Sequence, residues 1–337
     1  MADKVTIAVD AMGGDDAPGV VLDGVAQALA ADGGLNVVLC GPADVVEPFA
    51  AAHERCEARA TTEVIGMGEH PAEAVRKKKD SSIVVGCRLV KEGEAQGFFS
   101  AGSTGACLAA GTLVMGRIKG VARPALATVI PSPVRPVVMC DVGANADCKP
   151  AYLVQFAQMA TIYAEKIVGI EHPRAALLNI GEEEAKGSQF AQEAHALLRE
   201  QLPNFAGNAE GGDILAATFD VIVTDGFTGN VCLKTIEGTS KTLFKTLKGI
   251  MMKTPLTKLG ALAIKGGLKE LMAQVSPDTY GGAPLLGVKG ACIVGHGSSS
   301  AYAVKNGVLT TAGVVRAGVS EIIAQTVAAG ASSATME

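Results

Sequence analysis

Four glycine-rich segments hold most of the residues in this chain that could do chemistry. Each follows an apolar run with the pattern of a strand and precedes a helical pattern; they are 100–106 (SAGSTGA), 141–148 (DVGANADC), 179–188 (NIGEEEAKGS) and 225–230 (DGFTGN). Glycine lets backbone N–H groups approach an anion closely, and the start of a helix favours negative charge. Turns that follow parallel strands leave a sheet at one edge, so we expect the four segments to meet there and bind a small anion such as phosphate.

Several residues in or near these segments are candidates for contacting such an anion. They are Gly102, Ser103, Thr104, Gly105, Asn145, Lys186, Asp225, Asn230 and His296. Lys186 can neutralise phosphate as a point charge, or it can be a solvated charge that balances the three glutamates before it. Asn230 can equally cap a helix that begins at Val231, and Asn145 can support a turn. The recurrence of the segments, rather than any single residue, indicates an anion site.

A serine nucleophile is the main alternative chemistry. The run 101–105 (AGSTG) resembles a nucleophile elbow, and Asp225 and His296 follow Ser103 in the order that α/β-hydrolases use. Ser103 would then attack an acyl carbonyl, with His296 as base and Asp225 as its orienter. The competing interpretation, which we favour, is that Ser103 and Thr104 cap a helix and line the anion site.

Composition excludes several classes of protein. The net charge of −5 argues against a nucleic-acid partner, and no run of 18 apolar residues could span a membrane. The eight cysteines form no C-x-x-C pair, which favours reduced core thiols in a cytoplasmic protein. No cluster of His and Cys predicts a metal, and no P-loop or convincing dinucleotide fingerprint is present, so we expect no cofactor.

The elements that must position the segments alternate between strand and helix. The predicted strands are 5–9, 35–39, 63–65, 97–100, 126–130, 137–141, 176–180, 221–224 and 291–294. Helical stretches lie between most of them, and Pro150 stands where a helix over 152–168 would begin. The pattern is typical of βαβ units, and the low aromatic fraction of 4% fits a parallel sheet buried on both faces. We therefore predict an α/β fold in which residues 1–337 form a single domain.

The segment 239–275 departs from this pattern because it carries seven lysines and one acid. On a helix Lys258, Lys265 and Lys269 share one face, and apolar residues that include Leu256 and Leu259 lie opposite. A basic amphipathic stretch indicates a membrane surface or an acidic partner, with a solvated surface helix as the alternative. We predict a helical pair that projects from the body and docks on anionic lipid. The membrane-contacting residues would be Leu256, Leu259, Leu262, Lys258, Lys265 and Lys269.

Taken together, the motifs resemble the bacterial phosphate acyltransferase family. The four segments are joined by 9–15 (VDAMGGD), Ala17-Pro18, 123–126 (RPAL), 285–290 (LLGVKG) and 296–298 (HGS). The resemblance covers residues from about 5 to 310, and the combination is specific although each motif is short. Many members carry His where this chain has Asp16 and Asn where it has Ser103. The second departure counts against Ser103 as a nucleophile, because asparagine cannot accept an acyl group.

The resemblance implies a fold, a reaction and a set of partners. The fold would be a three-layer α/β/α arrangement with a mostly parallel sheet, like that of the isocitrate and isopropylmalate dehydrogenases and the phosphotransacetylases. The reaction would convert acyl-acyl-carrier-protein and inorganic phosphate to acyl phosphate for phospholipid synthesis. The partners would be acyl carrier protein, an anionic membrane surface on the inner face, a second copy in a homodimer, and a membrane glycerol-3-phosphate acyltransferase.

Residue roles follow from the same resemblance. Lys186 would bind phosphate or the developing oxyanion, and Asn230 would polarise the thioester carbonyl. The segment 102–105 and Asn145 would cradle phosphate, and Asp225 and His296 would line the substrate site. Besides the hydrolase, two alternatives stay open: a phosphotransacetylase that uses acyl-coenzyme A, and a membrane-surface scaffold without activity.

Overall fold

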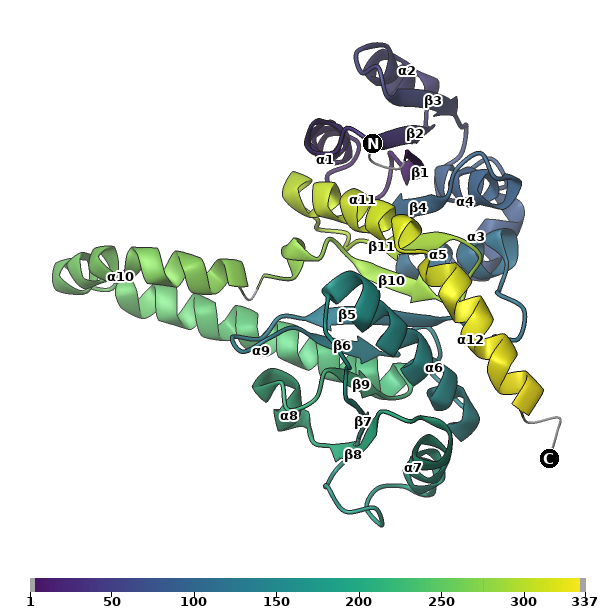
Figure 1. Ribbon diagram of the computed structural model, residues 1–337. Coiled ribbons are helices and arrows are strands. Elements are labelled where there is room, and N and C mark those ends of the chain that lie inside the picture. The colour runs from purple at the N-terminus through teal and green to yellow at the C-terminus, as the bar shows by residue number, and fades with distance from the viewer. Residues whose placement is uncertain (1–3, 275, 334–337) are drawn as a thin grey trace.

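The computed structural model describes residues 4–274 and 276–333, which build an eleven-stranded sheet covered by helices (Figure 1). The strand order is β3-β2-β1-β4-β11-β10-β5-β6-β9-β7-β8. The strands are β1 (Val5–Asp10), β2 (Leu35–Gly41), β3 (Cys56–Ala60), β4 (Gly97–Ser100), β5 (Ala125–Ile130), β6 (Val137–Cys140), β7 (Ala175–Leu178), β8 (Phe205–Ala209), β9 (Val221–Val223), β10 (Ala283–Leu286) and β11 (Ala291–Val294). The predicted α/β class with a mostly parallel sheet is confirmed.

Helices pack on both faces of this sheet and bury its apolar side chains. The helices are α1 (Gly19–Ala31), α2 (Ala43–Ala51), α3 (Pro71–Lys77), α4 (Ser82–Glu92), α5 (Thr104–Ala110), α6 (Pro150–Tyr163), α7 (Gln189–Gln201), α8 (Gly211–Ala216), α9 (Gly226–Met251), α10 (Pro255–Gln274), α11 (Ala301–Arg316) and α12 (Val319–Ser333). Along β1, Ile7 and Val9 belong to one core cluster and Ala8 to the other. Alternate side chains of a strand point to opposite faces, so two buried faces require the continuous apolar runs seen in the sequence.

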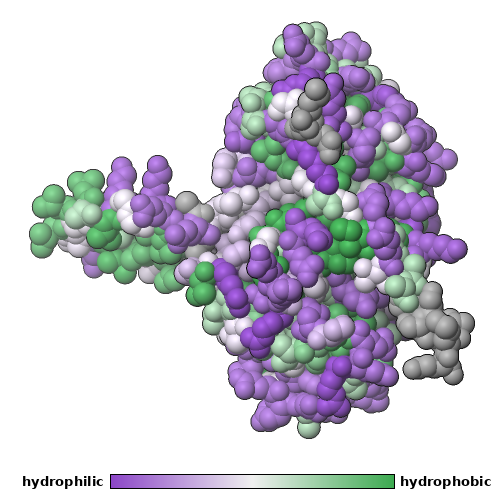
Figure 2. Space-filling model, in the orientation of Figure 1, coloured by the Kyte–Doolittle hydropathy of each residue, from purple (hydrophilic) through white to green (hydrophobic). Residues whose placement is uncertain are grey.

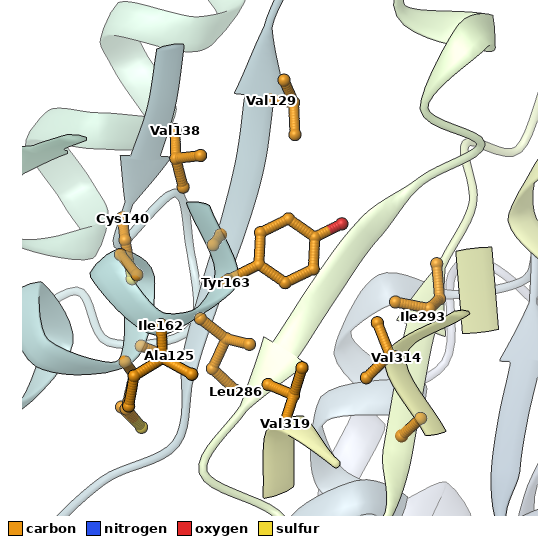
Figure 3. Packing of buried hydrophobic residues seen from close by; sticks show 14 of the residues in the cluster. Ala125, Val129, Val138, Cys140, Ile162, Tyr163, Leu286, Ile293, Val314 and Val319 are labelled. Carbon is orange, nitrogen blue, oxygen red and sulfur yellow. The ribbon is translucent and has the colours of Figure 1, made fainter. Parts of the chain in front are cut away.

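Tyr163, at the end of α6, anchors the larger core cluster. Its side chain is 1% exposed, and Figure 3 places the ring among Val129, Val138 and Leu286 from strands in the middle of the sheet. Burial in this apolar surrounding raises the pKa of the Tyr163 hydroxyl. Helix α6 has proline at its first turn, as the sequence predicted from Pro150.

Strand direction reverses in the middle of the sheet, and this separates the glycine-rich segments. β4 and β11 run parallel, β10 runs antiparallel to β11 and to β5, and β5 runs antiparallel to β6. β6, β9, β7 and β8 then share one direction, opposite to that of β4. The segment after β4 therefore leaves the sheet at one edge and the segments after β6, β7 and β9 leave at the other. The expectation that all four meet at one edge of one chain is wrong.

Other strand predictions fail where the sequence signal is weak. The predicted strand 63–65 is not formed, since Glu63 makes only an isolated bridge to Ser81 and the edge strand is β3. β3 (CEARA), β8 (FAGNA) and β10 (APLL) were not predicted. All three are rich in residues with low strand preference, such as alanine, glycine, asparagine and proline, so neighbouring strands and not local preference form them.

Helices α9 and α10 form a hairpin that projects from the body (Figure 1). α9 begins at Gly226, the second residue of the fourth glycine-rich segment. α10 is continuous through Gly266 and Gly267. Apolar residues gather along this hairpin (Figure 2), and Leu256, Leu259 and Leu262 are 79%, 66% and 66% exposed. Within the described residues no single helix has the length and hydropathy to cross a membrane; α11 and α12 reach both only as a pair bent by 48°.

Candidate active site

The first loop cluster consists of residues 10–15, 100–105 and 295–298. Asp10, at the end of β1, accepts hydrogen bonds from the Met12 N–H at 3.0 Å and the Ser100 hydroxyl at 2.7 Å. The Ser100 hydroxyl oxygen in turn accepts the Gly102 N–H at 3.0 Å. A Cβ at Gly13 would lie 2.7 Å from the Gly102 nitrogen, so only glycine allows the two loops to pack. Burial raises the pKa of Asp10.

His296 joins this cluster in the loop that follows β11. The Asp15 N–H donates to the Gly297 oxygen at 2.7 Å, and the Gly295 N–H donates to the Ser100 oxygen at 2.8 Å. The segment 102–105 and His296 therefore lie at one edge, but Lys186, Asn145 and Asn230 do not share it. The sequence-based prediction grouped all of them, because it took the sheet to be built from parallel βαβ units.

This arrangement contradicts the serine hydrolase alternative. Asp225 follows β9 and lies at the opposite edge from Ser103, where its Oδ1 accepts the Thr228 N–H at 2.8 Å and caps α9. The Ser103 hydroxyl accepts the Ala106 N–H at 3.4 Å as the cap of α5, and His296 Nδ1 lies 2.9 Å from the Ser298 hydroxyl. No triad of Ser103, His296 and Asp225 can form within one chain, and the predicted capping role of Ser103 is the one observed.

The second loop cluster consists of residues 141–148 and 225–230, and Asp141 organises it. Asp141 is fully buried at the end of β6. Its Oδ1 accepts the N–H groups of Leu126, Gly143 and Ala144 at 3.1, 3.1 and 3.0 Å. Its Oδ2 accepts the Asn145 backbone N–H and side-chain amide, both at 2.8 Å. Burial raises the pKa of Asp141, while these five donors act in the other direction.

Asn145 and Asn230 both belong to this second cluster. The backbone oxygen of Asn145 accepts a hydrogen bond from the Gly226 N–H at 2.8 Å, which connects the two loops. Asn230 donates one amide proton to the Val142 oxygen at 2.9 Å, and a carboxamide carries a second proton for another acceptor. The cap at the start of α9 is Asp225, so the alternative in which Asn230 caps a helix from Val231 is wrong. Asn230 is exposed on the first turns of α9 and can reach a substrate.

A cysteine beside this cluster is no nucleophile near neutral pH. The Cys148 thiol lies 3.4 Å from the Asn145 oxygen. Partial burial raises the pKa of Cys148 to about 11, so the thiol keeps its proton. An acyl-cysteine step at this site is therefore disfavoured.

Lys186 lies at the same edge as the second cluster, in the loop after β7. β7 pairs in parallel with β9, so their following loops leave the sheet side by side. The Lys186 N–H donates to the Glu183 oxygen at 3.0 Å, and the Asn179 amide donates to the Lys186 oxygen at 3.2 Å. Lys186 is exposed, and across residues 4–274 and 276–333 no carboxylate lies within salt-bridge distance of its ammonium group. The interpretation in which Lys186 only balances its neighbouring glutamates is not supported by an ion pair.

Sequence reasoning missed the residues that hold these loops in place. Asp10 and Asp141 each end a strand and are buried, and Asn208 and His195 lie 4% and 5% exposed next to the Lys186 loop. A charged residue directly after a buried apolar strand was a usable signal for the two aspartates. No local pattern identifies Asn208 or His195.

A cavity lies outside both loop clusters. It has a volume of about 500 Å³ and is lined at the starts of β4 and β11 by residues that include Val90, Lys91, Met115, Lys289 and Val314. None of the predicted site residues lines it. In the described part of the chain, no group of three or more His, Cys, Asp or Glu side chains is placed to hold a metal ion.

Comparison with known proteins now adds independent evidence. Residues 5–322 match the fatty acid synthesis protein family. A phosphate acyltransferase of Desulfitobacterium hafniense (strain Y51) is 49% identical over 321 residues, which cover 94% of this chain and 96% of that protein. A phosphate acyltransferase of Heliobacterium modesticaldum is 50% identical over 305 residues, which cover 89% and 91%.

Solved structures agree on the fold. A phosphotransacetylase from Streptococcus pyogenes superposes with a TM-score of 0.58 at 16% identity, covering 93% of this chain and 94% of that one. A branched-chain phosphotransacylase from Enterococcus faecalis V583 gives a TM-score of 0.57 at 16% identity, covering 92% and 99%. At this identity the likeness establishes the shared fold.

Proposed function

Because the chain belongs to the fatty acid synthesis protein family, whose members here are phosphate acyltransferases, we propose that it transfers an acyl group from acyl carrier protein to inorganic phosphate. The product would be an acyl phosphate for phospholipid synthesis. The observation that supports the assignment of the site is the second loop cluster, because Asn230 and Asn145 lie at the same edge of the sheet as Lys186, which has no ion pair among the residues that the structure describes.

The reaction needs positioning and charge stabilisation more than a strong base. A phosphate oxygen attacks the thioester carbonyl carbon, the carbon–sulfur bond breaks, and the thiolate that leaves takes up a proton from solvent. Lys186 would hold the phosphate or the carbonyl oxygen as negative charge develops there, and the free amide proton of Asn230 would polarise the carbonyl. No acyl-enzyme is required.

Phosphate dependence tests this proposal directly. Purified protein and palmitoyl-acyl-carrier-protein should release free thiol only when phosphate is present, and Lys186→Ala should remove most of that release. The lysine is exposed, so this substitution should leave the melting temperature unchanged. Thiol release without phosphate would indicate a thioesterase, and faster turnover of the coenzyme A thioester would indicate a phosphotransacetylase.

The first loop cluster enters the proposal through a second copy of the chain. One chain presents residues 102–105 and Lys186 at opposite edges of its sheet, so it cannot place both on the same phosphate. In a two-fold dimer the first cluster of one copy can face the second cluster of the other. The exposed apolar residues of α9, which include Phe227 at 64% and Leu243 at 64%, support such a contact.

Mixing two inactive variants tests the shared site. Lys186→Ala disables the second cluster, and Gly13→Ala disrupts the first because its Cβ would lie 2.7 Å from the Gly102 nitrogen. A mixed dimer keeps one site with both clusters intact, so random pairing should restore about a quarter of wild-type activity. No activity in the mixture, with mixed dimers demonstrated by affinity tags, would mean that each chain works alone.

We also propose that the α9–α10 hairpin docks on anionic lipid, next to the bilayer enzyme that would use the acyl phosphate. Leu256, Leu259 and Leu262 are exposed near its tip, and Lys258 and Lys265 could face phosphate headgroups. Each lysine near such a surface contributes about 1 kcal/mol. The protein should float with phosphatidylglycerol vesicles at low salt, and Leu259→Glu should reduce flotation without unfolding it. If the wild type does not float, the hairpin does not bind lipid, and its exposed apolar residues would serve a contact with protein instead.

A further inference from the structure

The loop that carries Lys186 poses an electrostatic problem. Three glutamates, at 182–184, directly precede the lysine, and a carboxylate near its ammonium group would compete with phosphate. In the structure the carboxylate of the third glutamate, Glu184, points toward α7. The Glu184 carboxylate lies 2.6 Å from the Arg199 guanidinium and 3.9 Å from His195 Nε2, both on α7. The loop thus turns Glu184, the acid nearest to Lys186 in sequence, toward α7, whereas the Glu183 carboxylate and the Lys186 side chain both lie close to Gly181.

Hydrogen bonds of side-chain amides, one of them buried, fix the loop in this orientation. His195 Nδ1 lies 2.9 Å from Asn208 Oδ1, and the Asn208 amide donates to the Glu183 oxygen at 2.9 Å. Gln192, one turn before His195, donates to the Ala185 and Gly187 oxygens at 2.8 and 3.3 Å. These contacts bracket Lys186 on both sides in sequence, so its backbone is held while its side chain stays exposed.

We propose that Arg199 holds Glu184 away from Lys186 and thereby sets the affinity of the site for phosphate. Arg199 is a positioning residue, since it contacts Glu184 and not the substrate. His195 and Asn208 hold the same loop, at the Glu184 carboxylate and at the Glu183 backbone oxygen. The inference rests on the proposed role of Lys186. A released carboxylate about 4 Å from the ammonium group in a water-like medium would contribute about 1 kcal/mol, which corresponds to an approximately fivefold rise in the KM for phosphate.

The test is a charge-matched set of variants. Arg199→Ala should raise the KM for phosphate about fivefold with little change in kcat, because the exposed ion pair itself adds little to stability. Adding Glu184→Gln to Arg199→Ala should restore the wild-type KM. Adding Glu193→Gln instead restores the same net charge, but the Glu193 carboxylate accepts a hydrogen bond from Gln189 on the exposed face of α7 and lies outside the Lys186 loop, so the KM should stay raised.

Two results would overturn the inference. One is an unchanged KM in Arg199→Ala, and the other is equal rescue by Glu184→Gln and Glu193→Gln, which would reduce the effect to net charge. Lys186→Ala keeps this outcome separate from the proposed function. If Lys186→Ala is inactive while Arg199→Ala behaves as wild type, only the role of Arg199 fails; if Lys186→Ala is fully active, the proposed site itself fails.

Discussion

Replacing Asp141 by asparagine should damage both stability and activity. The two carboxylate oxygens receive only donors, three on Oδ1 and two on Oδ2. An asparagine offers one oxygen, and its amide group would face N–H donors on the other side. The least harmful orientation keeps the oxygen toward Leu126, Gly143 and Ala144 and loses both bonds to Asn145.

The size of the effect follows from those two bonds. A hydrogen bond to a charged group contributes about 1.5–3 kcal/mol, so the loss is about 3–6 kcal/mol. With an unfolding entropy of roughly 2.1 cal/mol/K per residue over 337 residues, the melting temperature should fall by about 4–9 °C. Phosphate-dependent thiol release should also fall, because Asn145 would no longer be fixed beside Asn230.

Asp10→Asn is the matched control, measured by the same thermal melts. Asp10 is as deeply buried, but its Oδ2 faces the Ser100 hydroxyl, which can accept a hydrogen bond as well as donate one. An amide at that position keeps a partner, so the free energy of unfolding should drop by less than about 2 kcal/mol. If Asp141→Asn melts within a degree of the wild type, or if both variants lose the same amount, the number of donors does not determine the cost.

Two further predictions concern the first loop cluster. Ser103→Ala removes a long cap contact of 3.4 Å, so it should cost at most about 1 kcal/mol and leave substantial activity, whereas a nucleophile would lose roughly 10⁴-fold. Burial raises the pKa of Asp10, so the folded protein keeps this proton to higher pH than the unfolded chain does. The stability of the wild type relative to Asp10→Asn should therefore be greatest below the unfolded pKa of about 3.9 and fall as pH rises through the folded pKa; an increase with pH would contradict the assignment.

The sequence was sufficient to predict the class of the fold and most of its strands. β4 and β11 have the predicted bounds, and β1, β2 and β5 differ by two residues or fewer at each end. These strands are buried on both faces, so their sequences are continuously apolar and stand out from the helices around them. Apolar periodicity carries this information without reference to any neighbour.

The arrangement of the site could not be predicted as easily, although part of the signal was present. Only residues 131–136 separate β5 from β6, and both strands were predicted. A parallel crossover needs a dozen or more residues, so this connection had to be an antiparallel hairpin. That single reversal would have placed 100–106 and 225–230 at opposite edges. The hydrogen bond by which Asn208 holds the Lys186 loop at the Glu183 oxygen could not be predicted, because β8 has little strand signal of its own.

The two loop clusters meet the same physical requirement in the same way. Each ends a strand with a buried aspartate, Asp10 or Asp141, whose oxygens gather donors from a glycine-rich loop. These bonds fix the backbone of each loop, so a donor that the aspartate does not use, such as the second amide proton of Asn230, needs little reorganisation when charge develops on a bound oxygen. Strand reversal puts the clusters at opposite edges of one chain, and a two-fold axis can bring unlike edges of identical chains together twice. The direction of four strands, rather than any catalytic side chain, is therefore the basis of the proposal that two copies share a site.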